Sequence, residues 1–183
     1  MKALFFSDIH GSPHSLALLQ EKIKELAPDK LVLLGDIFLC GGQSTLDSST
    51  ARKQTAAWLN RWQDKIIAVR GNCDRDCDQK LLNFPILVEY RILEIDGHRF
   101  FLSHGHCWNP GHLPPEGVAD ILVNGHTHIP QLTRDGDGLV CFNPGSLALP
   151  RGDSLPSFGF YSEHILYIYP LDGTCKPLSQ LAL

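Results

Sequence analysis

The chain opens with an apolar run that ends abruptly in a polar turn: residues 3–11 read ALFFSDIHG. The same arrangement recurs at residues 31–36 (LVLLGD), 66–74 (IIAVRGNCD), 100–106 (FFLSHGH) and 121–128 (ILVNGHTH). Each apolar run has the length of a strand, and its lack of polar alternation is typical of strands that are buried on both faces. We therefore predict five buried strands, each followed by a sharp turn.

Helical patterns fill the gaps between the first three predicted strands. Ser12 and Pro13 have the residue types of a helix N-cap and first turn, and the apolar spacing of three and four that follows is interrupted at Pro28. A second helix is expected from about residue 49 to 63, and a short third helix over residues 76–83. Such helices supply the crossover connections that parallel strands require.

The second half of the sequence contains hairpin signals instead. Asp96-Gly97 separates two strand-like segments, and residues 135–138 (DGDG) separate two more. βαβ units in the first half of the chain and hairpins in the second half predict an α/β fold. In this fold two mixed β-sheets pack face to face, with helices outside. No shift in composition marks a boundary, so we expect a single domain over residues 1–183.

Charge and composition exclude several classes of protein. The chain has 16 Lys and Arg against 20 Asp and Glu, a formal net charge of −4, and no block of like charges. This argues against extended nucleic-acid binding and against a membrane-surface protein. No apolar run approaches the roughly 20 residues that span a bilayer. Because no export signal is recognisable, we expect a cytoplasmic protein whose six cysteines are reduced thiols.

Every predicted strand ends in side chains that can bind a metal ion. They are Asp8, His10, Asp36, Asn72, His104, His106, His126 and His128. In open α/β sheets ligands bind at the carboxyl ends of the strands, and residues i and i+2 of an extended segment point the same way. A single Asp or His at a strand end is more often a cap or turn residue. Five such ends in one chain favour a joint metal site.

The ordered motifs D-x-H, G-D, G-N-x-D, G-H and G-H-x-H resemble those of calcineurin-like metallophosphoesterases. Residues 71–74 (GNCD) and 143–146 (NPGS) resemble in particular the YfcE-like phosphodiesterases, and Vps29 belongs to the same fold group. The resemblance implies a four-layer α/β/β/α fold. It also implies a dinuclear metal-dependent phosphodiesterase, which hydrolyses small phosphodiesters by in-line attack of a metal-activated water or hydroxide on phosphorus.

The resemblance further implies which residues bind the two metal ions. Asp8, His10, Asp36 and His128 would hold the first ion, while Asp36, Asn72, His104 and His126 would hold the second, with Asp36 as the bridge. Mixed oxygen and nitrogen ligands suit Mn²⁺, our first expectation, and also Ni²⁺, Zn²⁺ or Fe, better than Ca²⁺. Two ions about 3.5–4 Å apart can activate a water and clamp phosphoryl oxygens.

Cys73 departs from the wider family pattern, in which many members carry a histidine that is thought to protonate the leaving oxygen. The YfcE-like group resembles this sequence in having cysteine there. A thiol with a pKa of about 8.5 suits that task poorly at neutral pH. His106 or a metal-bound water is the alternative acid, and Cys73 as a small apolar residue stays equally open. Asp74 is expected either to orient the site or to be a turn carboxylate.

Two other functions stay open from the sequence. A protein-interaction scaffold, as in Vps29, would be expected to have lost its ligands and to carry a broad apolar patch. A phosphomonoesterase is disfavoured by Cys73. The expected partner of the enzyme is a small phosphodiester substrate, and a homo-oligomer is compatible with the sequence. Arg70 and Arg151 are candidates for steering an anionic substrate, although the sequence places neither side chain.

Overall fold

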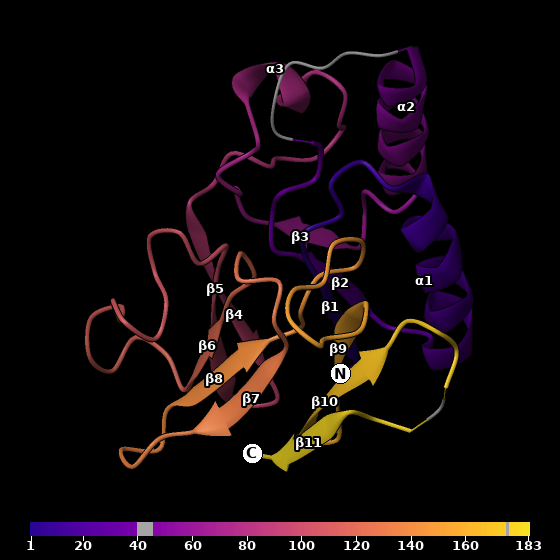
Figure 1. Ribbon diagram of the computed structural model, residues 1–183. Helices are drawn as coiled ribbons and strands as arrows, with labels where there is room; N and C mark the ends of the chain where they lie inside the picture. The colour runs from indigo at the N-terminus through magenta and orange to yellow at the C-terminus, as the bar shows by residue number, and fades with distance from the viewer. Residues whose placement is uncertain (40–45, 175) are drawn as a thin grey trace.

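Two β-sheets form the framework of the protein, whose computed structural model describes residues 1–39, 46–174 and 176–183 (Figure 1). The six-stranded sheet has the order β11-β10-β9-β1-β2-β3, and the five-stranded sheet has the order β4-β5-β6-β8-β7. Both sheets contain parallel and antiparallel pairs. The predicted pair of mixed sheets is therefore confirmed.

The six-stranded sheet is built from both ends of the chain. Its strands are β1 (Ala3–Phe6), β2 (Lys30–Leu33), β3 (Ile66–Ala68), β9 (Ser157–Ser162), β10 (Ile165–Pro170) and β11 (Ser179–Ala182). β1 pairs in parallel with β2, and β2 with β3, which confirms the predicted crossovers. On its other side β1 pairs antiparallel with β9. The centre of the sheet thus joins the first strand of the chain to one of its last.

The five-stranded sheet comes from the middle of the chain. Its strands are β4 (Tyr90–Ile95), β5 (His98–Ser103), β6 (Ile121–Val123), β7 (Gln131–Arg134) and β8 (Val140–Asn143). β4 and β5 form the hairpin predicted at Asp96-Gly97, and β7 and β8 form the hairpin predicted at residues 135–138. β5, β6 and β8 run parallel to one another, so their carboxyl ends meet at one edge.

The helices are α1 (Pro13–Leu26), α2 (Leu46–Asn60) and α3 (Asp76–Gln79). α1 begins as predicted, with the Ser12 hydroxyl accepting a hydrogen bond from the Ser15 N–H at 3.2 Å. α2 starts and ends earlier than predicted. It ends early because the next residues form tighter bonds such as Trp62 N–H to Leu59 O. α3 is shorter than predicted, because the Gln79 side chain bonds the backbone of residues 82, 84 and 86 and holds them in a turn.

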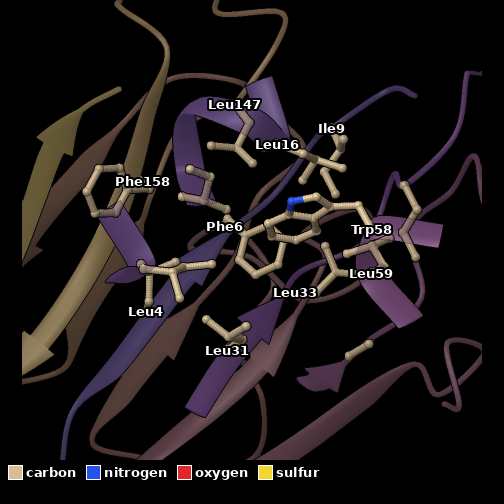
Figure 2. Packing of buried hydrophobic residues seen from close by; sticks show 14 of the residues in the cluster. Leu4, Phe6, Ile9, Leu16, Leu31, Leu33, Trp58, Leu59, Leu147 and Phe158 are labelled. Carbon is tan, nitrogen blue, oxygen red and sulfur yellow. The ribbon is translucent and has the colours of Figure 1, made fainter. Parts of the chain in front are cut away.

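Alternate residues of β1 face two separate cores. Leu4 and Phe6 point towards α1 and α2, where they pack with Leu33 and Trp58 (Figure 2). Phe5 points the other way, into the space between the sheets, and stacks on Phe100 with ring centroids 5.8 Å apart. The two cores make the sheets and the helices one packed unit.

The fold class predicted from the sequence is confirmed, with one difference in the outer layers. The outer face of the five-stranded sheet is covered by the loop between β5 and β6 rather than by a helix. Trp108 and Val118 from this loop pack on Phe101 and Leu122 of the sheet. Among the described residues, no helix is both long and apolar enough to cross a membrane.

Candidate metal centre

The first cluster of predicted ligands lies beyond the carboxyl end of β1. The Asp8 Oδ1 atom lies 3.2 Å from the Nε2 atom of His128 and 3.8 Å from the Nε2 atom of His10. The two imidazole Nε2 atoms are 3.3 Å apart, although 118 residues separate them in the sequence. Three potential ligand atoms from the ends of two sheets therefore converge on one point.

The second cluster lies beside the first, beyond β2, β3 and β5. The Nε2 atom of His104 is 3.0 Å from the Oδ1 atom of Asn72 and 3.4 Å from the Oδ1 atom of Asp36. The His126 ring is next to it, with its centroid 5.1 Å from that of the His104 ring. The structure thus brings together the four side chains that the resemblance assigns to the second ion.

Asp36 stands between the two clusters. Its Oδ1 atom faces His104 of the second cluster, and its Oδ2 atom lies 3.9 Å from the Nε2 atom of His10 in the first. The Oδ1 atom also accepts a hydrogen bond from the Cys73 N–H at 2.8 Å, which fixes the orientation of the carboxylate. One carboxylate with an oxygen towards each cluster has the arrangement of a bridging ligand.

Two of the histidines have their Nε2 atoms turned towards the centre by a hydrogen bond at Nδ1. His104 donates a hydrogen bond from Nδ1 to the Leu34 carbonyl at 2.7 Å, and His128 donates one from Nδ1 to the Leu149 carbonyl at 2.5 Å. In a neutral imidazole with its proton on Nδ1, the Nε2 atom carries a free lone pair. Such backbone carbonyl partners commonly orient metal-binding histidines.

The donor set fits divalent metal ions. The Asp8 Oδ1 atom is buried and has no hydrogen-bond partner among the described residues. A buried carboxylate oxygen without a partner is costly unless a cation or a protonated group compensates it. Because carboxylate oxygen, amide oxygen and imidazole nitrogen face this point together, the set suits ions such as Mn²⁺, Ni²⁺, Fe or Zn²⁺.

The pKa values of the histidines follow burial and neighbouring charge. Burial lowers the pKa of His10 and of His126, which keeps both imidazoles neutral and able to bind a metal near neutral pH. The Asp8 carboxylate raises the pKa of His128, against the effect of burial. The positive charge of Arg151 also opposes protonation of His128.

Most of the proposed ligands have a strained backbone. Positive φ angles occur at Asp8 (55°), His10 (46°), Asp36 (51°), His126 (68°) and His128 (61°). Residues other than glycine adopt this region rarely, and such strain concentrates at functional sites. The sequence did not reveal this feature, since only the neighbouring glycines hinted at sharp turns.

Buried hydrogen bonds fix the backbone turns that carry the proposed ligands. Asp74 is 1% exposed, and its carboxylate accepts bonds from the backbone of Asp36, Ile37 and Gly71 at 2.8–3.0 Å. It therefore orients the turns rather than facing the centre. The buried Ser146 hydroxyl donates to the Asp8 carbonyl at 2.9 Å. Sequence reasoning missed this role of Ser146, because the two residues are 138 apart and no motif links them.

The remaining predicted catalytic residues have mixed outcomes. Cys73 is disulfide-bonded, while Cys77, Cys107 and Cys141 are free. The expectation of reduced thiols is therefore wrong at Cys73, and because a disulfide sulfur carries no ionisable proton, Cys73 in this form cannot act as an acid. His106 lies at the solvent edge of the second cluster, with its ring centroid 5.5 Å from that of His104.

Comparison with known proteins agrees with this geometry. Residues 1–164 match the calcineurin-like phosphoesterase superfamily domain. The chain is also 38% identical over 172 residues to the phosphodiesterase YfcE of Escherichia coli K12, covering 94% of this chain and 93% of that protein.

The chain belongs to the calcineurin-like phosphoesterase superfamily.

Two solved structures have the same fold. The structure of the E. coli phosphoesterase YfcE superimposes with a TM-score of 0.90 at 37% sequence identity, over 100% of this chain and 99% of that one. Vps29 of Entamoeba histolytica, solved in complex with Zn²⁺, has a TM-score of 0.62 at 22% identity, over 100% of this chain and 99% of that one. At that identity Vps29 supports the shared fold alone.

Proposed function

We propose that this protein is a dinuclear metal-dependent phosphodiesterase that hydrolyses small phosphodiesters. The observation that carries the proposal is the position of Asp36, whose two carboxylate oxygens face His10 of one ligand cluster and His104 of the other. A single shared carboxylate between two histidine clusters suits a pair of cations, whereas a structural site needs only one. The relationship to a phosphodiesterase of the same superfamily supports the reaction class.

Asp8, His10, Asp36 and His128 would hold the first ion, and Asp36, Asn72, His104 and His126 the second. When bound, two divalent ions, Mn²⁺ in the first instance, supply charge neutralisation for the phosphate and activate a water for in-line attack on phosphorus. The chain itself contributes rigid placement. Backbone carbonyls fix His104 and His128, and Asp74 fixes the two turns that carry Asp36 and Asn72.

His106 is our candidate for delivering a proton to the leaving oxygen. Its imidazole is partly exposed beside the second cluster, and its Nε2 atom lies 3.7 Å from the Glu89 carboxylate, whose charge favours the protonated imidazole. Cys73 has no such role in its disulfide-bonded form. Burial, and then the neighbouring His104, lower the pKa of His106, so less of its acid form is present near neutral pH and the enzyme should prefer esters with good leaving groups.

The proposal is tested with protein stripped of metal and reloaded with Mn²⁺. We expect two ions bound per chain and hydrolysis of bis(p-nitrophenyl) phosphate, with activity abolished in Asn72→Ala and His126→Ala. His14→Ala, which changes an exposed histidine of α1 away from the centre, is the matched control and should retain full activity.

Three results would contradict the proposal. Metal-loaded protein that turns over no phosphodiester would favour a protein-interaction scaffold on the same fold. Faster hydrolysis of p-nitrophenyl phosphate than of the diester would instead identify a phosphomonoesterase. Binding of one ion per chain would refute the dinuclear arrangement even if hydrolysis were observed.

A further inference from the structure

Arg151 lies beside the first ligand cluster, and no described residue forms an ion pair with its guanidinium. Its backbone N–H donates to the carbonyl of His128 at 3.2 Å, and its own carbonyl accepts a bond from Ser154 N–H at 3.3 Å. The root of the side chain is therefore fixed next to a proposed metal ligand. The guanidinium itself is exposed, and it forms no hydrogen bond or ion pair with any residue that the structure describes.

Most other arginines of the chain have a partner for the guanidinium. Those with a hydrogen bond or ion pair are Arg52, Arg61, Arg70, Arg91, Arg99 and Arg134. Asp153, only two residues from Arg151, is not within ion-pair distance of it, and Gly152 between them has a φ of 61°. The free charge of Arg151 is thus available to a ligand.

On the His106 side of the metal centre, the nearby arginine has ion-pair partners. Arg70 lies near His106, but its guanidinium is 3.7 Å from the Glu89 carboxylate and 4.0 Å from that of Asp76. Its charge is already balanced by two acids. Within the described residues, Arg151 therefore places a positive charge without an ion pair on the His128 side of the centre.

Apolar side chains lie next to Arg151 on the same segments. Ile129 follows His128 directly and is 49% exposed, and Leu149, whose carbonyl holds His128, is 47% exposed. Exposed apolar groups beside a guanidinium suit a ligand with an apolar body and an anionic end. A simple dialkyl phosphodiester has no second anionic group that could pair with the Arg151 guanidinium.

From this arrangement, and given the proposed phosphodiesterase function, we infer that Arg151 determines substrate specificity by binding a second anionic group of the substrate. The substrate class is a phosphodiester in which one ester group has an apolar or aromatic body and carries a further carboxylate or phosphate. That group would lie over Ile129 and Leu149 while the scissile phosphate occupies the metal centre. The further charge is unchanged during hydrolysis, so Arg151 would contribute to binding more than to the chemical step.

A matched pair of substrates tests the inference. Phenyl p-nitrophenyl phosphate and 4-carboxyphenyl p-nitrophenyl phosphate share the phosphodiester and the leaving group and differ by one carboxylate. We expect the Mn²⁺-loaded wild type to have the higher kcat/KM with the carboxylated ester. In Arg151→Gln the ratio of the two kcat/KM values should fall by about tenfold, which corresponds to about 1.4 kcal/mol, and the change should appear in KM.

Controls separate a charge effect from a structural one. Arg151→Lys, which keeps the charge, should recover part of the ratio, and Arg134→Gln, which removes a charge at β7, should keep the wild-type ratio. The same ratio in wild type and Arg151→Gln would overturn the inference while leaving the phosphodiesterase proposal intact. No turnover of either ester by the wild type would instead contradict the proposed function, and the specificity role with it.

Discussion

The carboxylate of Asp74 accepts a hydrogen bond from the backbone nitrogen of Asp36 at 3.0 Å, although the two residues are 38 apart in the sequence. The same carboxylate accepts bonds from Gly71 N–H at 2.8 Å and Ile37 N–H at 2.9 Å. One buried side chain therefore links the turn after β2 to the turn after β3. The positions of Asp36 and Asn72 relative to one another depend on this link.

Asp74→Asn should loosen both turns. In either orientation of the asparagine amide, its NH₂ group would face a backbone N–H, so at least one buried donor would lose its partner, at a cost of about 1–3 kcal/mol. We expect a lower free energy of unfolding, measured with denaturant, and weaker Mn²⁺ binding, measured by calorimetry. Asp76→Asn is the control, because that side chain is 88% exposed. Equal losses in both variants would refute the link.

Gly125 is required at its position by close contacts with the turn that follows β1. A Cβ atom there would overlap the Ser7 hydroxyl and lie 2.8 Å from the Asp8 Oδ2 atom. Gly125→Ala should therefore destabilise the protein by about 1–3 kcal/mol and displace Asp8, with a loss of metal affinity. In Gly136→Ala the added Cβ meets nothing within 4 Å, so that variant should match the wild type in thermal unfolding and metal binding.

The positive φ at His126 predicts an unusual order of stabilities. In metal-free protein, His126→Gly should be more stable than His126→Ala by about 1 kcal/mol, because alanine retains the steric cost of the left-handed region. His106 is not among the residues with positive φ, so there the alanine variant should be the more stable of the two. Thermal unfolding of the four variants measures both orders. The same order of stabilities for the glycine and alanine variants at both positions would contradict the inferred backbone strain at His126.

Ionisation of Tyr161 should lower the stability of the folded protein at alkaline pH. Burial, and then the hydrogen bond from its hydroxyl to Asp96, raise the pKa of Tyr161 to about 12. The pKa of Tyr161 is higher in the folded protein than in the unfolded chain. Its contribution to stability is therefore complete below the ordinary tyrosine pKa of about 10. That contribution is lost as the pH rises from this value towards the folded pKa. Ultraviolet titration of tyrosinate in the folded protein measures the shift. Tyr161→Phe should reduce the alkaline loss of stability, whereas Tyr90→Phe at an exposed position should not.

Local sequence was sufficient to predict the strands that carry the ligands. The runs at β1 and β6 are buried on both faces, and the residue types at their ends already indicated metal binding. β9 was not predicted, because Gly159 interrupts its pattern. In the structure the absent side chain of Gly159 makes room for the ring of Phe142, a contact that only the packed sheets can reveal.

Contacts distant in sequence account for what could not be predicted at the centre. The role of Ser146 depends on the carbonyl of Asp8, and the place of Arg151 depends on the carbonyl of His128. Both carbonyls belong to the backbone and would be present with any residue type, so no sequence motif indicates these contacts. Which imidazole nitrogen faces the metal ions likewise follows from the carbonyls of Leu34 and Leu149 rather than from the histidine spacing.

The position of β1 between β2 and β9 has a consequence for biosynthesis. β1 is synthesised long before its antiparallel partner β9, which begins only at Ser157. At about 5–20 residues per second, an apolar strand edge therefore stays unpaired for roughly 8–30 seconds of synthesis. Unpaired edges of this kind can pair with other chains, so the nascent protein should depend on chaperones until β9 emerges.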